Sequence, residues 1–139
     1  MFAEFEHLIH KKAQEGEALT PDLLTELYYD LNKKYFGEDI VIDKEIGLEW
    51  ARIPHFYYNY YVYQYATGFS AATALSKQIL EEGEPAVTRY INNFLKAGSS
   101  DYPIEVLKNA GVDMTSADPI KEACKVFEQK LTEMEKLLS

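Results

Sequence analysis

The chain of 139 residues carries 14 Lys and Arg against 23 Asp and Glu, a net charge of −9 at pH 7. An acidic chain lacks the basic face that follows phosphates, so we expect no nucleic-acid partner and no membrane partner. With 47% hydrophobic residues, the chain should fold around a core of its own, in about one domain. The single cysteine, Cys124, excludes an internal disulfide and suits a reducing compartment.

Two helices are predicted near the N-terminus. Over residues 2–15, apolar side chains recur at helical spacing, and Gly16 is a typical residue just past a helix end. Thr20 can cap a second helix, because its hydroxyl can accept a backbone N–H and Pro21 suits the first helical position. The second helix should end at Gly37, and the short connection predicts an antiparallel pair.

A long segment without charged side chains, residues 56–76, occupies the middle of the sequence. Its length approaches that of a bilayer span, but polar residues and six tyrosine hydroxyls interrupt it. We therefore predict a central helix over about 55–82, surrounded by protein. A short helix over 44–50 should precede it, with Pro54 interrupting or restarting the chain.

Three further helices are predicted in the last third of the chain. The segment 83–85 should end the central helix and start the next, 103–111 should form a short helix, and Asp118 should begin the last one. Five apolar residues of the last helix are expected to face inward: Ile120, Phe127, Leu131, Met134 and Leu138. The prediction is an all-α helical bundle, with residues 1–139 forming a single all-helical unit.

The sequence lacks the residue patterns of three familiar kinds of active site: a di-metal site, a zinc protease helix and a nucleophilic cysteine. Glu4 and His7 resemble half of a di-metal site, but no second copy exists, so His7 and His10 are expected to be surface residues. A His-Glu-x-x-His zinc helix is absent, so we predict no metal site within this chain. Cys124 lacks a histidine nearby and is interpreted as a small packed residue rather than a nucleophile.

The remaining feature is a run of aromatic residues, since six of the 11 tyrosines fall between Tyr57 and Tyr65. On a helix, His55, Tyr58, Tyr61 and Tyr65 would share one face. Such a row of donors could hold a peptide carbonyl, a carboxylate or a developing oxyanion. Alternatively, the tyrosines are core aromatics whose hydroxyls find backbone partners. The residues alone leave both interpretations open.

The same run carries a resemblance to a known family. Residues 52–68 (RIPHFYYNYYVYQYATG) resemble the C-terminal tyrosine-rich helix of oligoendopeptidase F, a zinc metallopeptidase family related to thimet oligopeptidase. Five other stretches are similar to the same family: MFAEFE at 1–6, LYYDL at 27–31, YFG at 35–37, GEP at 83–85 and YINNFLKAGS at 90–99. The resemblance therefore runs along essentially the whole chain.

The resemblance implies that this chain is the C-terminal part of a larger, mostly helical catalytic domain. In such enzymes a zinc-bound water attacks the peptide carbonyl, with the glutamate of the His-Glu-x-x-His motif as base. That motif would lie N-terminal to the matched part. Zinc would then be a cofactor of the full-length enzyme and would not be bound by this chain, which should be inactive alone. The missing N-terminal part is expected as a partner, and apolar faces left exposed could drive self-association.

By resemblance, His55 and Tyr58 are assigned catalytic roles, donating hydrogen bonds to the substrate and the tetrahedral oxyanion. Tyr61, Tyr57 and Tyr65 are assigned to substrate binding, with the register along the run uncertain by about one turn. The implied function is hydrolysis of peptide bonds in short peptides, by a cytoplasmic enzyme whose partner is an oligopeptide substrate. The alternative is a non-catalytic helical module that binds a peptide or a protein through its tyrosine face.

Overall fold

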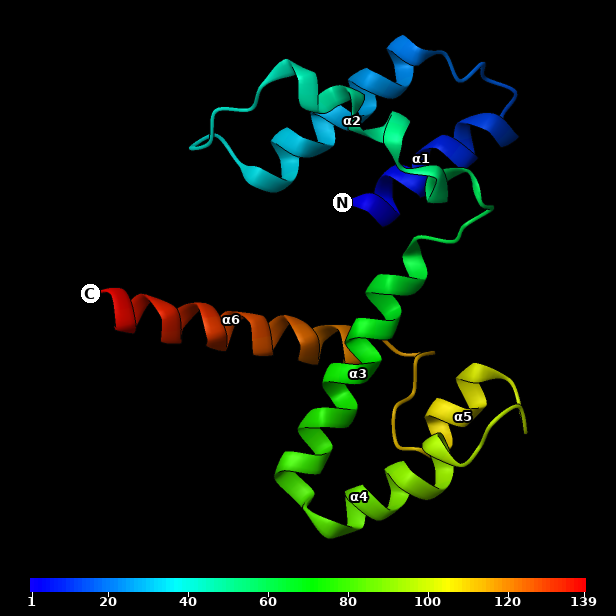
Figure 1. The fold of residues 1–139 in the computed structure, drawn as a ribbon, viewed down its shortest axis with the longest axis vertical. Helices are drawn as coiled ribbons and strands as arrows, with labels where there is room; N and C mark the ends of the chain where they lie inside the picture. Colours follow the sequence, from blue (N-terminus) through cyan, green and yellow to red (C-terminus); the bar gives the residue numbers. More distant parts are fainter. The chain divides into compact units, whose positions relative to one another are not determined.

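The computed structural model describes residues 1–139, which form helices and connecting loops without strands, so the predicted all-α class is confirmed. Two compact units are present, residues 1–66 and residues 67–139. The organisation of 1–139 as one all-helical unit stays a prediction. In chain order the elements are α1 Phe2–Gln14, α2 Pro21–Phe36, the 3₁₀ helices η1 Lys44–Arg52 and η2 Pro54–Tyr57, α3 Tyr63–Glu82, α4 Glu84–Tyr90, the π-helical turn η3 Ile91–Leu95, α5 Pro103–Asn109 and α6 Asp118–Leu138 (Figure 1).

The ends of α1 and α2 follow the local signals of the sequence. The Leu23 N–H donates to Thr20 Oγ1 at 3.3 Å, so Thr20 caps α2 as predicted, with Pro21 as its first residue. At the other end, Gly37 adopts φ 79°, a conformation that glycine reaches without steric cost. These boundaries depend on neighbouring residues, which is why the sequence predicts them.

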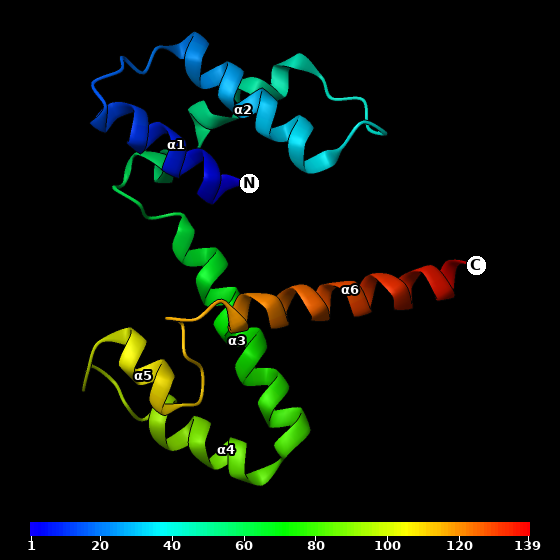
Figure 2. The same ribbon diagram turned by 180° about the vertical axis from the view of Figure 1, so that it is seen from behind.

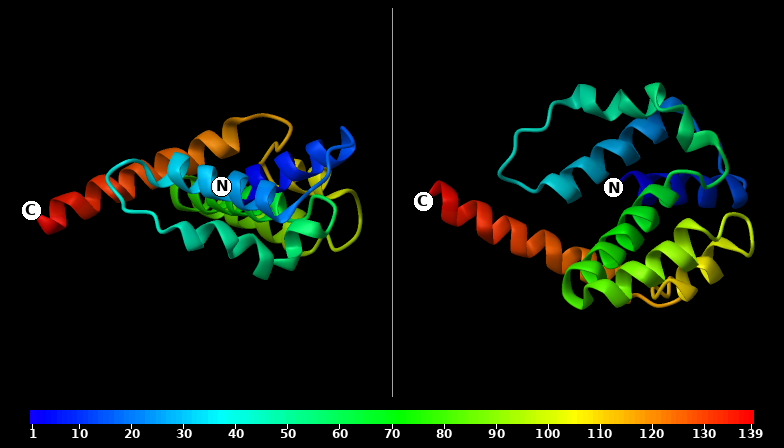
Figure 3. Two further views of the ribbon diagram at one scale, coloured as in Figure 1. Left: turned by 90° about the horizontal axis from the view of Figure 1, so that it is seen from above. Right: turned by 60° about the horizontal axis from the view of Figure 1, so that its bottom comes forward.

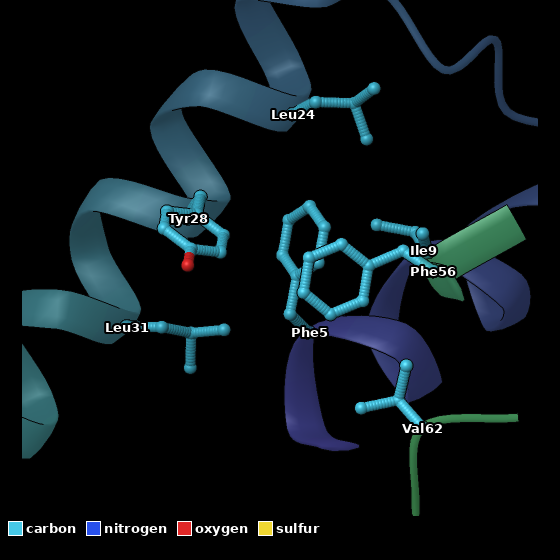
Figure 4. Packing of buried hydrophobic residues seen from close by; sticks show 7 residues of the cluster. All are labelled: Phe5, Ile9, Leu24, Tyr28, Leu31, Phe56 and Val62. Carbon is cyan, nitrogen blue, oxygen red and sulfur yellow. The ribbon is translucent and has the colours of Figure 1, made fainter. Parts of the chain in front are cut away.

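The core of the first unit is built from aromatic and aliphatic side chains of α1, α2 and η2. Figure 4 shows the rings of Phe5 and Phe56 lying against each other, with Tyr28 and its α2 neighbours on one side. The ring centres of Phe5 and Phe56 are 4.9 Å apart, and those of Phe5 and Tyr28 are 5.1 Å apart, both edge to face. All three side chains are fully buried, so this core fixes η2 against the two helices.

The central helix is shorter than predicted. Instead of one helix over 55–82, η2 ends at Tyr57, a non-helical segment follows, and α3 begins at Tyr63. Asn59 and Tyr60 have φ of 48° and 62°, which a right-handed helix cannot contain. The prediction was wrong here because periodicity does not reveal a left-handed turn made by residues other than glycine.

The second unit is built around the part of α3 from Thr67 onward. Ala71, Ala74 and Leu75 are buried against Ala110 and Val112, and Figure 2 shows α4 and α5 folding back beside α3. The small side chains of Ala71 and Ala74 on α3 allow this close approach. None of the helices is both long enough and apolar enough to cross a membrane.

The last helix, α6, differs from the prediction in what it buries. In the three sets of views it projects from α3 as a separate rod (Figures 1, 2 and 3). Only Pro119 at its start is buried. The five residues expected to face inward are all exposed: Ile120, Phe127, Leu131, Met134 and Leu138. Cys124 is also exposed, so its predicted packed position is wrong. The reason is that no other helix of the second unit runs beside the apolar face of α6.

Candidate functional site

The structure brings together His55, Tyr58, Tyr61 and Tyr65, which we call the His55–Tyr65 cluster. The imidazole of His55 stacks on the ring of Tyr61 at 5.4 Å, with an interplanar angle of 24°. Tyr58 meets both rings edge-on, at 5.7 Å from His55 and 6.3 Å from Tyr61. Tyr65 lies 5.8 Å from Tyr61. The predicted neighbours are therefore adjacent, although a turn rather than a helix places them.

The exposed fractions of the side chains show which residues of the run belong to the core and which lie at the surface. Tyr58, Tyr61 and Tyr65 are 57%, 38% and 62% exposed, whereas Phe56 and Val62 are buried in the core. The core role within this run therefore belongs to Phe56 and Val62. The tyrosines of the cluster present their rings at the surface of the first unit, where a ligand can reach the hydroxyls.

Tyr57 lies outside the cluster. Its hydroxyl donates to the backbone oxygen of Trp50 at 3.3 Å, and partial burial raises the pKa of its phenol. This hydrogen bond ties η2 to the end of η1. The substrate-binding role predicted for Tyr57 stays a prediction, and its position gives it a different environment from Tyr58.

A left-handed turn at Asn59 and Tyr60 separates Tyr58 from Tyr61. The turn is held by Glu6 of α1, which is fully buried. The N–H of Val62 donates to Glu6 Oε1 at 2.8 Å, and the N–H of Tyr63 donates to Oε2 at 3.1 Å. Glu6 thus satisfies two backbone donors where α3 begins, as a carboxylate at a helix N-terminus does.

Two further residues of α1 hold Tyr60. The ring of His10 lies 4.4 Å from that of Tyr60, and Gln14 Nε2 donates to the Tyr60 hydroxyl at 3.2 Å. His10 Nδ1 is also 2.7 Å from the backbone oxygen of Glu6. The expectation that both histidines are surface residues holds for His7, which is exposed, but His10 is half-buried in this contact.

Sequence reasoning missed Glu6, Gln14 and the role of His10. The available signal was their spacing, because positions 6, 10 and 14 lie on one face of a helix. A glutamate on an amphipathic helix is ordinarily solvent-exposed, so nothing local distinguished Glu6. Only its partners, 56 and 57 residues away, explain its burial.

The hydroxyls of Tyr61 and Tyr65 interact with each other. The hydrogen bond between the two phenols raises the pKa of Tyr65 above its usual value. An imidazole N–H and a phenol O–H can each donate a hydrogen bond to a carbonyl or carboxylate oxygen. This donation requires no metal ion in this chain.

Polar contacts also anchor the segment that leads into the cluster. The buried Tyr28 hydroxyl donates to Glu49 Oε2 at 2.6 Å, and Arg52 pairs with the same carboxylate. The hydrogen bond from Tyr28, and to a smaller extent that from Arg52, lowers the pKa of Glu49. Burial, followed by the contact with Glu49, raises the pKa of Tyr28. The network joins η1 to α2, two residues before Pro54 restarts the chain.

Residues suited to hold a metal are not grouped in this chain. No set of three or more His, Cys, Asp or Glu side chains could hold an ion. Glu4, considered above as half of a di-metal site, accepts hydrogen bonds from Lys34 at 2.6 Å and Tyr35 at 2.9 Å. Since zinc requires at least three protein ligands at a catalytic site, the residues of this chain do not fit one.

Two large hollows lie elsewhere on the chain. One, of about 790 Å³, is lined by α3, α4 and α5 in the second unit, and the other, of about 1040 Å³, lies between α2 and η1 in the first. Neither is lined by a residue of the His55–Tyr65 cluster. The lining of both is mainly apolar.

A comparison with models of protein families shows to which family the chain belongs. The model of peptidase family M3 matches residues 1–126. The chain belongs to this family. Among curated relatives, it is 80% identical over 138 residues to oligopeptidase PepF of Bacillus subtilis and 54% identical to group B oligopeptidase PepB of Streptococcus agalactiae. The alignments cover 99% of this chain, but 20% and 23% of those relatives. The resemblance to oligoendopeptidase F is thus confirmed, and the chain spans about a fifth of the length of these relatives.

Solved structures agree with the family and with the fold. The crystal structure of oligoendopeptidase-F from Enterococcus faecium matches with a TM-score of 0.91 at 55% identity, over 99% of this chain and 26% of that one. A putative peptidase from Chlamydophila abortus matches with a TM-score of 0.86 at 46% identity, over 98% of this chain and 23% of that one. The fold of this M3 chain therefore matches a small part of each of these longer chains.

Proposed function

We propose that this chain is the C-terminal part of a zinc-dependent oligoendopeptidase, in which it supplies the His55–Tyr65 cluster to the substrate cleft. The main supporting observation is the half-buried imidazole of His55 between two exposed phenols, Tyr61 at 5.4 Å and Tyr58 at 5.7 Å, in a chain of peptidase family M3. The relatives named oligopeptidase and oligoendopeptidase support short peptides as the substrate class.

In the proposed reaction, His55 and Tyr58 donate hydrogen bonds to the oxygen of the scissile carbonyl. These bonds strengthen as negative charge develops on that oxygen, so the donors favour the transition state over the bound substrate. Tyr61 and Tyr65 line the neighbouring surface and orient the peptide. Tyr57 is assigned to the same binding surface, reached from η2.

The remaining parts of the site are assigned to the preceding portion of the parent enzyme. We place the zinc ligands there, because this chain groups no three suitable side chains. The chain alone is therefore proposed to be inactive. A cytoplasmic location and association between copies through exposed apolar faces, such as that of α6, belong to the same proposal.

The experiment that tests this function compares two phenol-to-phenyl substitutions in the full-length enzyme. Tyr58→Phe keeps the ring but removes the proposed donor. Turnover should fall about a hundred- to a thousandfold, with little change in substrate affinity, as for loss of one oxyanion donor. Tyr29→Phe is the matched control, since the Tyr29 hydroxyl donates to the backbone oxygen of Ile42 at 3.4 Å and lies outside the cluster.

Steady-state kinetics on a fluorogenic peptide would measure both variants, together with Tyr57→Phe, Tyr61→Phe and Tyr65→Phe. A strong loss confined to a different tyrosine would move the donor by about one turn and keep the function. Near-normal turnover for the four variants other than the control would contradict the catalytic role of the tyrosines and favour the non-catalytic binding module.

A further inference from the structure

We infer that Glu6 is a positioning residue, which sets the angle between Tyr58 and Tyr61 around His55 by holding the left-handed turn between them. This inference rests on the proposed function, because it concerns how the proposed donors are oriented. Glu6 lies in α1 and is not itself a member of the cluster.

The first observation is the burial of Glu6 together with its paired contacts. Its side chain is fully buried, and each carboxylate oxygen accepts one backbone N–H, from Val62 and from Tyr63. No basic side chain hydrogen-bonds it. A buried carboxylate is costly unless its oxygens are satisfied, so these two contacts define one arrangement of the segment.

The second observation is the conformation that these contacts hold. Two successive residues, Asn59 and Tyr60, have left-handed φ angles, and for a bulky residue such as Tyr60 this is a strained conformation. Strain persists only where surrounding contacts enforce it. Glu6 lies on the C-terminal side of the turn, while His10 and Gln14 hold the Tyr60 ring within it.

The third observation is the position of the turn in the cluster. Tyr58 immediately precedes the turn and Tyr61 immediately follows it, yet both rings lie within 6 Å of His55. A continuous helix would orient the two phenols differently, because Asn59 and Tyr60 would then have right-handed φ angles instead of 48° and 62°. The face of α1 formed by Glu6, His10 and Gln14 therefore determines where the donors point.

The experiment is a double-mutant cycle in the full-length enzyme, with Glu6→Gln measured alone and in the Tyr58→Phe background. Gln keeps the size of the side chain but places an amide NH₂ against a backbone donor. Since displacing a catalytic group by about 1 Å can cost on the order of a hundredfold, we expect Glu6→Gln to lower kcat tenfold or more. In the Tyr58→Phe background the same change should cost no more than about twofold.

Glu4→Gln serves as the matched control on the same helix. Glu4 also accepts two hydrogen bonds, but from Lys34 and Tyr35 of α2, away from the turn. Its kcat should stay close to that of the wild type. Melting temperatures show whether each variant folds. Should Glu6→Gln fail to fold, the half-buried His10→Ala takes its place in the cycle, with a smaller loss of kcat that also disappears in the Tyr58→Phe background.

The outcomes separate this inference from the function on which it rests. Near-normal kcat for Tyr58→Phe overturns the proposed role of Tyr58, and this inference with it. A damaging Tyr58→Phe combined with a harmless Glu6→Gln overturns the inference alone. Equal losses from Glu6→Gln in both backgrounds also overturn it, because they would mean that Glu6 acts independently of Tyr58.

Discussion

At the scale of single residues, residues 55–65 contain both core side chains and surface side chains. Phe56 and Val62 are buried among α1 and α2, whereas Tyr58 and Tyr61 are exposed and His55 is half-buried. The buried pair holds the backbone, so the exposed rings are presented from a rigid base. Substitutions at the two kinds of position should therefore have different effects, on stability in one case and on catalysis in the other.

His55→Ala in the full-length enzyme should both lower kcat and raise KM. The imidazole can hold the ground-state carbonyl as well as the oxyanion, so its loss removes binding in both states. Removal of its ring also deprives Tyr61 of its stacking partner and Tyr58 of an edge-on contact. Steady-state kinetics check this expectation. A change in neither parameter would place the reacting carbonyl away from His55.

Phe56→Ala should lower the free energy of unfolding by about 3–5 kcal/mol, since a fully buried phenyl ring leaves a cavity between Phe5 and Tyr28. Urea unfolding of the full-length enzyme measures the loss. Tyr57→Ala, at a neighbouring half-exposed position, should cost clearly less. Equal losses at the two positions would contradict the division between core and surface.

At the scale of the elements, helix α6 is tied to α3 by charge rather than by its apolar face. Lys77 of α3 forms an ion pair with Glu122 of α6, which also accepts from Lys125 at 2.6 Å. The hydrogen bond from Lys125, which has the larger effect, and that from Lys77 lower the pKa of Glu122 to about 2. The exposed face with Phe127 and Leu131 takes no part in this link.

The attachment of α6 should therefore weaken in acid. Glu122 has a lower pKa in the folded state than the usual value of 4.5, so its contribution to stability is complete above about pH 4.5 and is lost as the pH falls towards about 2. The difference in the free energy of unfolding between wild type and Glu122→Gln should shrink across this range. A difference that stays constant with pH would contradict the ion pair, and high salt should also reduce it.

At the scale of the whole molecule, the chain brings an imidazole and three phenols together but groups no set of metal ligands. It spans about a fifth to a quarter of the relatives that it matches, and it groups no three metal-binding side chains. Its exposed aromatic and aliphatic residues, from Tyr58 to Leu138, are surfaces suited to further protein. The proposed function divides the active site between this chain and the preceding part of the parent.

The isolated chain should bind no zinc in stoichiometric amount and should not hydrolyse peptides. Elemental analysis after treatment with a mild chelator and a fluorogenic peptide assay measure the two properties. The full-length enzyme, treated in the same way, is the control that should keep both. Retention of one zinc per isolated chain would contradict the proposed division of the site.

Local residue patterns determined most element boundaries and the family. Thr20 and Pro21 begin α2, Gly37 ends it, and the run RIPHFYYNYYVYQYATG identifies the family without reference to any contact. Caps, proline and glycine act on adjacent backbone groups, so their effects can be predicted from a few residues. The adjacency of His55, Tyr58 and Tyr61 was also predicted, although from a helix that does not exist there.

The tertiary structure alone decided the turn at Asn59 and Tyr60, and therefore how the cluster is presented. The helical spacing of the run was compatible with a continuous helix, and only contacts from α1 select the left-handed alternative. Glu6 contributes them from 56 residues away, and its buried carboxylate must be satisfied by the N–H groups of Val62 and Tyr63. A local pattern describes which residues can share a face, but the free energy of burying a charged group depends on partners that folding brings together.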